Sequence, residues 1–278
     1  MLVPLAGGGQ ETLLSEVGFV LLPLFSTRDA CALRLVCREF LAAVSEHPWE
    51  DRRTVIMGCI AAWRACFPHA RCANVCKEDM NSDDEMRAAP VVDADFEHFE
   101  GLRELYMAGC RDVTDAAFVH LRGIHTLDMS GFNKDTVTDA AFAHLAGIQR
   151  LSMFCGQATI TDAAFAHLQG IQLLNMGFCT QITDAAFVHL RGIHTLYMWY
   201  CFQPAITDAA FVHLRGIHTL VVDSCSQATI TGATFSSLKG AFLLGMHDCS
   251  AAAIATATGL GLPVSTESGI LGNFSYLL

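Results

Sequence analysis

The sequence predicts an α/β solenoid, with a parallel sheet on the inside and helices on the outside, preceded by a small all-α helical domain. Two observations lead to this fold class. A phrase of the form Val/Ile-Thr-Asp-Ala-Ala-Phe recurs every 22–24 residues from Val113 onwards, and such a period is typical of stacked structural units. Residues 11–76 do not repeat and carry apolar side chains at helical spacing instead.

Composition limits the functions that the chain can have. With 52% apolar and 16% charged residues among 278, the chain can bury a sizeable core and is not mainly disordered. The net charge of -11 argues against nucleic acid as the main ligand. The apolar run Val17–Phe25 is too short to cross a membrane and contains Pro23. Without a basic, signal-like start, we expect a cytoplasmic protein, or one also found in the nucleus, with reduced thiols.

The first domain is predicted to be a small helical bundle. After a flexible N-terminus (1–10), helices are expected within Glu11–Leu24, Thr27–Val44 and Thr54–Cys66, which together define a domain over 11–76. Its apolar content exceeds what so small a bundle needs inside, so an apolar patch is expected to remain for a partner.

An acidic linker is predicted to follow this domain. The segment Lys77–Pro90 has no apolar period and ends in a proline, as solvated connections do. Residues 77–100 carry two basic and nine acidic side chains, a net charge of -7. Most of the excess negative charge therefore lies between the helical domain and the repeats.

Seven repeat units are predicted over 91–250. In each, Thr-Asp supplies an N-cap, Ala-Ala-Phe-x-x-Leu places Phe and Leu on one helix face, and a glycine follows as C-cap. The next residues alternate between apolar and polar, as in Ile124–Met129, which indicates a short strand. No unit can bury its apolar face alone, so the units must stack and pair their strands in parallel.

The repeats resemble the leucine-rich-repeat family in its cysteine-containing subtype. The family pattern Leu-x-x-Leu-x-Leu-x-x-Cys followed by Ile-Thr-Asp is matched at Leu102–Asp115 and Ile193–Asp208. The resemblance implies that the repeated cysteine packs in the turn after the strand, where its sulfur hydrogen-bonds backbone. Five residues occupy that position: Cys110, Cys179, Cys201, Cys225 and Cys249.

The concave face is the predicted site for a protein target. Residues that flank the buried strand positions differ from unit to unit while the scaffold hardly changes. Exposed aromatic side chains among them are of the kind that anchors interfaces, although the tyrosines and the tryptophan could instead pack against one another. The predicted target-binding residues are Tyr106, Asp128, Arg150, Phe154, Asn175, Tyr197, Trp199, Asp223 and His247.

The first domain resembles an F-box. Leu13, Glu16 and Val17 match its opening pattern, Asp29 matches the start of its second helix, and Leu35–Arg38 matches Leu-Val-Cys-Lys/Arg. The chain departs from the family at Leu14, where a proline is usual, and at Phe40, where a tryptophan is usual. The resemblance implies docking to the adaptor Skp1, and through it to a cullin ubiquitin ligase. The residues that would dock Skp1 or support docking are Leu13, Leu14, Val17, Leu35, Val36, Cys37, Phe40 and Trp49.

The sequence therefore predicts a non-catalytic substrate-recognition subunit of a Skp1–cullin–F-box ubiquitin ligase, with an unknown protein substrate. The alternative is an interaction scaffold without a ligase, whose helical head only caps the repeats. No cofactor, metal, nucleic-acid or membrane partner is expected. The cysteines and histidine between 59 and 76 lack the paired Cys-x2-Cys spacing of zinc modules. Residues 251–278 are expected to form a degenerate, partly unfolded C-terminal cap.

Overall fold

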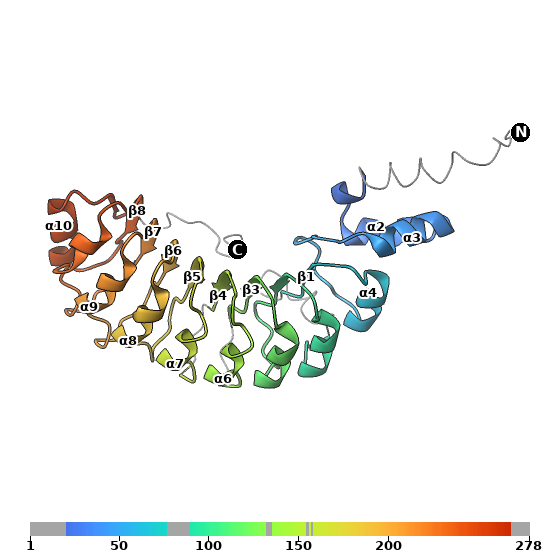
Figure 1. The fold of residues 1–278 in the computed structure, drawn as a ribbon, viewed down its shortest axis with the longest axis horizontal. Coiled ribbons are helices and arrows are strands. Elements are labelled where there is room, and N and C mark those ends of the chain that lie inside the picture. Colours follow the sequence, from blue (N-terminus) through green and yellow to red (C-terminus); the bar gives the residue numbers. More distant parts are fainter. Residues whose placement is uncertain (1–20, 77–88, 132–134, 154–155, 157, 268–278) are drawn as a thin grey trace, which may run out of the picture.

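The computed structural model describes residues 21–76, 89–131, 135–153, 156 and 158–267. They form a curved solenoid with strands on the concave side, helices on the convex side and a helical head at one end (Figure 1). One sheet of nine parallel strands runs through the molecule in sequence order from β1 to β9. This confirms the predicted α/β solenoid.

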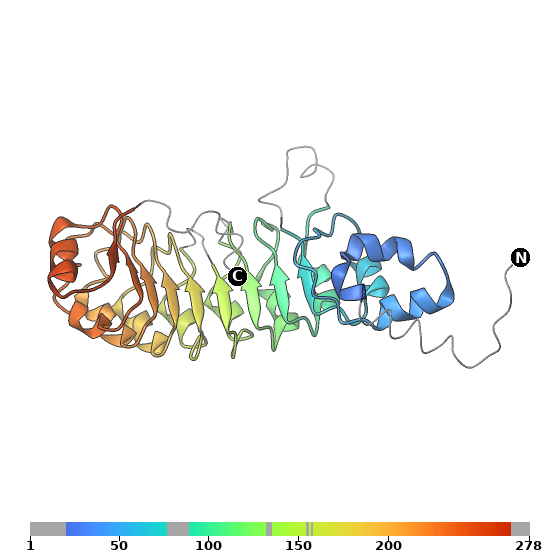
Figure 2. The ribbon, with the colours of Figure 1, turned by 90° about the horizontal axis from the view of Figure 1, so that it is seen from above.

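The strands are short, lie side by side (Figure 2) and pair in a constant register. The central leucine of one strand pairs with that of the next, from Leu105 through to Leu244, and this row is fully buried. The strands are β1 Cys72–Asn74, β2 Glu104–Tyr106, β3 Thr126–Asp128, β4 Arg150–Ser152, β5 Leu173–Asn175, β6 Thr195–Tyr197, β7 Thr219–Val221, β8 Leu243–Gly245 and β9 Val264–Ser265.

The convex side consists of helices only one or two turns long, because a unit of about 23 residues must also hold a strand and two connections. Their phenylalanines, from Phe118 to Phe235, are at most 1% exposed and form one column. The helical segments of the units are η2 Asp93–Phe99, η3 Asp115–Leu121, α6 Asp139–Phe142, α7 Asp162–Phe165, α8 Asp184–Phe187 with η4 Val188–Leu190, α9 Asp208–Phe211 with η5 Val212–Leu214, and η6 Phe235–Leu238.

The ends of these helices follow the predicted chemistry. The threonine before each Asp-Ala-Ala accepts a hydrogen bond from the backbone N–H of the first alanine, two residues further on, as Thr138 does from Ala140 at 3.2 Å. After η3, Arg122 (φ -58°, ψ 129°) and Gly123 (φ 81°) form the centre of a type II turn closed by Ile124 N–H to Leu121 O. The repeated glycine thus ends the helix because that turn needs a left-handed residue.

The head differs from the three helices predicted by sequence. Within its described part lie η1 Leu22–Leu24, α2 Thr27–Leu33, α3 Arg38–Glu46 and α4 Ile60–Cys66. The helix expected over Thr27–Val44 is divided, because Leu35 and Val36 form a turn and Cys37 is extended (φ -159°). The last helix begins only at Ile60, since Val55 and Ile56 pair in extended form with Asn74.

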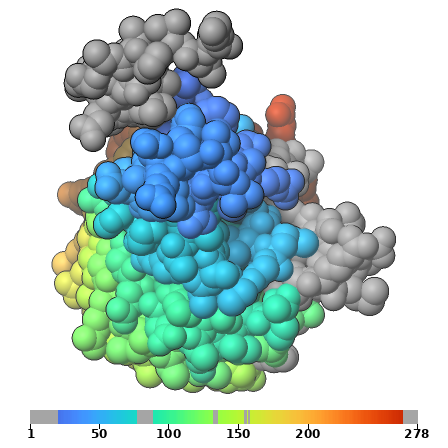
Figure 3. Space-filling model, turned by 90° about the vertical axis from the view of Figure 1, so that its right-hand side faces the viewer, coloured from blue at the N-terminus to red at the C-terminus, as the bar shows by residue number. Residues whose placement is uncertain are grey.

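The head also contains the first strand of the sheet, which the helical prediction for 11–76 missed. Strand β1 pairs in parallel with β2, and Ala73 and Val75 belong to the same apolar core as the repeats. Helix α4 packs beside η2, and Arg64 donates to the backbone oxygen of Glu100. Figure 3 shows the head seated on the end of the solenoid. The head therefore covers apolar surface that a terminal unit would otherwise expose.

The C-terminal end continues the architecture further than expected. Residues Ala251–Gly259 form helix α10, capped by the Ser250 hydroxyl, and Val264–Ser265 add strand β9 to the sheet. Ala253 and Ala257 are buried in the same apolar core as the repeats. Residues 251–265 thus contribute a helix and a strand, while 268–278, the rest of the expected partly unfolded cap, lie outside the described residues.

Candidate protein-binding surfaces

A ladder of carboxylates and threonines fastens each unit to the next. The Asp184 carboxylate accepts the Thr207 backbone N–H at 2.8 Å and the Thr207 hydroxyl at 2.6 Å. The Thr207 hydroxyl oxygen in turn accepts the Ala209 N–H at 3.1 Å. The same pairing joins Asp93 to Thr114, Asp115 to Thr138, Asp139 to Thr161, Asp162 to Thr183 and Asp208 to Thr231. The sequence analysis did not predict this role of the aspartates, although their recurrence at one repeat position could have indicated it.

The repeated cysteines form a second ladder, as the family resemblance implies. The Cys225 sulfur lies 2.9 Å from the Met198 carbonyl oxygen, and the Cys249 sulfur lies 3.1 Å from that of Val222. Burial raises the pKa of the Cys249 thiol to about 12. These cysteines are neutral hydrogen-bond donors inside the solenoid, which is a structural role.

Polar residues at the centre of the concave face form hydrogen bonds with one another. The Ser130 hydroxyl lies 2.6 Å from the Asp128 carboxylate and 2.7 Å from the Ser152 hydroxyl, and the Asn175 amide donates to Ser152 at 3.3 Å. Asp128 is only 4% exposed and Asn175 only 3%. The predicted target contacts Asp128 and Asn175 therefore belong to a buried network across β3, β4 and β5.

Three concave aromatic residues, Tyr106, Tyr197 and Trp199, are buried as well, which contradicts their predicted exposure and agrees with the alternative that such residues pack against one another. Tyr197 and Trp199 pack edge to face with ring centroids 6.4 Å apart and contact Val221 and Leu173. Tyr106 packs against Cys72 of β1. Exposure is 8% or less for all three aromatic residues. Leu173 of β5 and Val221 of β7 pack against Tyr197 and Trp199 because neighbouring strands lie only about 4.8 Å apart.

The remaining predicted concave residues differ in their placement. Arg150, Asp223 and His247 are half-buried, and Phe154 lies outside the described residues. Burial raises the pKa of the Asp223 carboxyl, and the hydrogen bond from the His247 N–H at 2.9 Å offsets part of that effect. Asp223 and His247 stand together at the C-terminal end of the concave face, away from the buried centre.

An aromatic patch that sequence analysis missed lies where strands β5 and β6 lead into their turns. Phe178 and Tyr200 are stacked with centroids 4.7 Å apart, and Phe202 meets Tyr200 edge on at 5.8 Å. Their exposed fractions are 37%, 41% and 53%. We call these three residues the aromatic edge.

Two members of the aromatic edge have an unfavourable backbone conformation. Phe178 (φ 61°) and Tyr200 (φ 52°) are left-handed at the repeat position where earlier units have Gly109 and Gly131. A left-handed conformation costs an L-residue roughly 1–2 kcal/mol, and such conformations gather at functional sites. Ser224 (φ 57°) and Asp248 (φ 53°) are left-handed at the same position, so the conformation belongs to the repeat turn, and it is the exposure of the rings that suggests binding.

This strain predicts an inverted order of stability at Tyr200. Tyr200→Gly is expected to be more stable than Tyr200→Ala by about 1 kcal/mol, because only glycine relieves the left-handed strain after the ring is lost. Urea denaturation of the two variants measures the difference. Phe202 is the control, since it lies on the same edge without a left-handed backbone, and there alanine is expected to be at least as stable as glycine. Equal behaviour at both positions would contradict the strain argument.

In the head, the predicted docking residues separate into exposed and buried groups. Leu35 and Val36 are 88% and 66% exposed on the turn between α2 and α3, whereas Cys37 and Phe40 are half-buried. Trp49 is 2% exposed, and its indole N–H donates to the Val44 carbonyl oxygen at 2.8 Å. Trp49 thus positions α3 and has no free surface to dock a partner. Leu13, Leu14 and Val17 lie outside the described residues.

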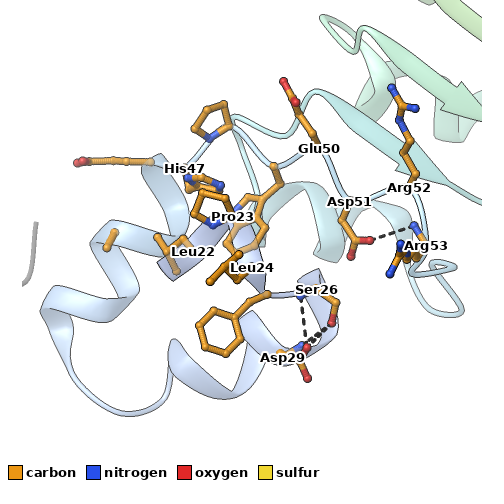
Figure 4. A pocket seen from close by; sticks show the side chains of 15 residues that line it. Leu22, Pro23, Leu24, Ser26, Asp29, His47, Glu50, Asp51, Arg52 and Arg53 are labelled. Atoms are coloured by element: carbon orange, nitrogen blue, oxygen red, sulfur yellow. Dashed lines mark hydrogen bonds between the residues drawn. The ribbon is translucent and has the colours of Figure 1, made fainter. Parts of the chain in front are cut away.

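An open pocket of about 1300 Å³ lies beside the start of α2 (Figure 4). Leu24, which is 78% exposed, and Asp51 are among the residues that line it. Burial alone would raise the pKa of the Asp51 carboxyl, but hydrogen bonds from Thr27, Thr54 and Arg53 outweigh it and lower the pKa. The ionised Asp51 thereby ties the first turn of α2 to the segment that leads into the sheet.

Among the described residues, no cluster of three or more His, Cys, Asp or Glu side chains could hold a metal ion. Within the same part of the chain, no helix is both long and apolar enough to pass through a bilayer.

Comparisons with known proteins identify the fold. No protein-family model matches the sequence, and no curated protein matches it. Among solved structures, the chain is similar to TLR13 from its complex with ssRNA13 (TM-score 0.51, 16% identity) over 68% of this chain. It spans 30% of that protein. It is also similar to human 5T4, trophoblast glycoprotein (TM-score 0.52, 16% identity), over 71% of this chain and 78% of 5T4. Both are leucine-rich-repeat proteins, and their likeness with the nine-stranded parallel sheet shows that this chain folds as an α/β leucine-rich-repeat solenoid.

Proposed function

We propose that the protein is a non-catalytic substrate receptor of a Skp1–cullin–F-box ubiquitin ligase. Its head docks the Skp1-like adaptor, and its solenoid holds a protein target near the ubiquitin-charged enzyme. The chemistry supplied by this chain is proximity, because holding two reactants together raises their effective concentration.

The observation that carries the proposal is the exposure of Leu35 and Val36. These residues lie in the Leu-Val-Cys-Arg stretch that resembles the F-box, and they project from a turn that the rest of the head leaves uncovered. Leaving two such aliphatic side chains in water forgoes about 1.5–3 kcal/mol each, compared with burying them. A partner with an apolar groove would bury them and gain that free energy.

For the target, we propose the aromatic edge with the half-buried Asp223 and His247 as its contact surface. This surface replaces the centre of the concave face, whose polar and aromatic side chains already satisfy one another. Leucine-rich-repeat structures are protein-interaction folds, and large aromatic side chains contribute most where they can be fully covered.

A pull-down with purified Skp1 tests the ligase association. Wild-type protein is expected to retain Skp1, and Leu35→Asp/Val36→Asp is expected to lose it, because two carboxylates would be buried unpaired in the contact. Val119→Asp/Val188→Asp is the matched control, since these valines are 41% and 39% exposed on the convex side. Wild type that fails to bind, or a head variant that binds as well as the control, would refute the proposal.

The alternative function is an interaction scaffold without a ligase. It is favoured by the contacts that make the head a cap, namely strand β1 in the sheet and the Arg52–Glu104 ion pair at 2.6 Å. Capping involves α4 and β1, whereas docking would involve the turn between α2 and α3, so one head can do both. A chain that binds no Skp1 would leave capping as the whole role of the head.

A further inference from the structure

A second surface, unrelated to the concave face, lies where the strands begin. The residue just before each strand hydrogen-bonds its neighbour in the adjacent unit, so that His194, His218 and Phe242 follow one another along this edge. Three residues earlier in each unit, at the first central position of the type II turn, stand Arg191, Arg215 and Lys239. We call these six residues the turn edge.

The rings of the turn edge are stacked in a continuous column. The centroids of His194 and His218 are 4.5 Å apart with planes at 12°, and those of His218 and Phe242 are 5.0 Å apart at 17°. Phe242 is 71% exposed. A stack of this kind covers ring faces and presents ring edges to solvent, and ring edges carry the positive end of the aromatic quadrupole.

The cations beside this column are exposed. None of Arg191, Arg215 and Lys239 forms an ion pair with a carboxylate of the described residues. Arg191 instead lies 3.4 Å from the His213 ring nitrogen of the next unit. Three full charges and a column of positive ring edges therefore face the solvent together.

Acidic residues of the same units lie elsewhere. Asp184 lies at the start of α8, seven residues before Arg191, and Asp208 lies at the start of α9, seven residues before Arg215. Seven helical residues correspond to roughly 10 Å between aspartate and arginine. Both carboxylates are already hydrogen-bonded in the Asp–Thr ladder. Since the Debye length is about 8 Å at physiological salt, the local positive charge dominates at the turn edge although the chain as a whole is negative.

We propose that the turn edge is a docking surface for an acidic, extended peptide segment of a partner protein. Carboxylates would pair with the arginines and the lysine and lie against the ring edges, while an apolar side chain covers Phe242. Single-stranded nucleic acid fits less well, because its bases need free ring faces, and the faces between His194, His218 and Phe242 are stacked against one another. The inference goes beyond Skp1 docking and does not depend on it.

Fluorescence anisotropy with a labelled hexaglutamate peptide at low salt tests this surface. Wild-type protein is expected to bind the peptide, more weakly as salt rises. Arg191→Glu/Arg215→Glu is expected to weaken binding at least about tenfold, because two attractions become repulsions. The matched control is Arg103→Glu/Arg122→Glu, which makes the same charge change on the same edge but outside the stacked column.

Several results would overturn the inference: no binding by wild type, equal loss in the control, or tighter binding of a hexauridylate than of hexaglutamate. The Skp1 pull-down separates this outcome from failure of the proposed function. The Arg191→Glu/Arg215→Glu variant and its control are both expected to bind Skp1 like wild type, because neither changes the head.

Discussion

Phe187→Ala is expected to lower the free energy of unfolding by about 3–5 kcal/mol, the usual cost of emptying a buried phenylalanine site. Phe187 is fully buried in the middle of the phenylalanine column, between Phe165 and Phe211. The strict register of the sheet prevents the units above and below from closing the cavity, because each strand is hydrogen-bonded on both sides. In a solenoid each unit contacts only its neighbours, so a weak unit in the middle loosens both halves.

Urea denaturation followed by circular dichroism measures this loss. Val188→Ala is the matched control, because Val188 is the next residue and is 39% exposed; it is expected to change stability by no more than about 0.5 kcal/mol. If the two variants were equally stable, the phenylalanine column would not be the main support of the repeats.

Asp184→Ala is expected to cost about 2–4 kcal/mol, because one truncation removes two charge-assisted hydrogen bonds and weakens the cap of the following helix. The Thr207 N–H and hydroxyl both lose their acceptor, and the Thr207 oxygen that caps α9 loses its fixed position. Asp184→Asn keeps an acceptor for the N–H and is expected to lose less.

A double-mutant cycle with Thr207→Val isolates the ladder. The losses of unfolding free energy in the two single variants are expected to add up to more than the loss in the double variant, with a coupling of about 1–3 kcal/mol. Thr207→Ser, which retains the hydroxyl, serves as the conservative control. Purely additive effects would show that the carboxylate and threonine are neighbours without a shared contribution to stability.

The sequence predicts the parts of this fold that depend on local periodicity. The helix starts at Thr138 and Thr207, the buried phenylalanines and the glycine turns all follow from spacing within one unit, and each is confirmed. Contacts between units are harder to foresee. Asp184 reads as a residue of its own helix start, whereas its partner is the threonine of the next unit.

The interaction surfaces were less predictable for two physical reasons. Alternation along a strand tells which side chains leave the core, but Tyr197 and Trp199 of one unit then pack against each other and against Leu173 and Val221 of the neighbouring strands. The aromatic edge depends on left-handed residues at Phe178 and Tyr200, and sequence reasoning expects only glycine, asparagine or aspartate there. The exposed turn at Leu35–Val36 interrupts a segment whose apolar spacing suggested one continuous helix.

The Asp–Thr ladder also determines how the solenoid could change its length. The aspartate of one unit accepts hydrogen bonds from the threonine of the next unit. Removing or duplicating a whole Asp-containing unit would therefore leave every Asp–Thr junction chemically identical. The series of aspartates ends at Gly232, which stands where another aspartate would be. The Gly232 N–H donates to the Asp208 carboxylate at 2.8 Å. A Cβ atom at Gly232 would lie 2.9 Å from the Thr256 Cβ of α10. The unit that has glycine in place of this aspartate is therefore the one against which α10 packs, so a single residue both ends the Asp–Thr ladder and makes room for the last helix.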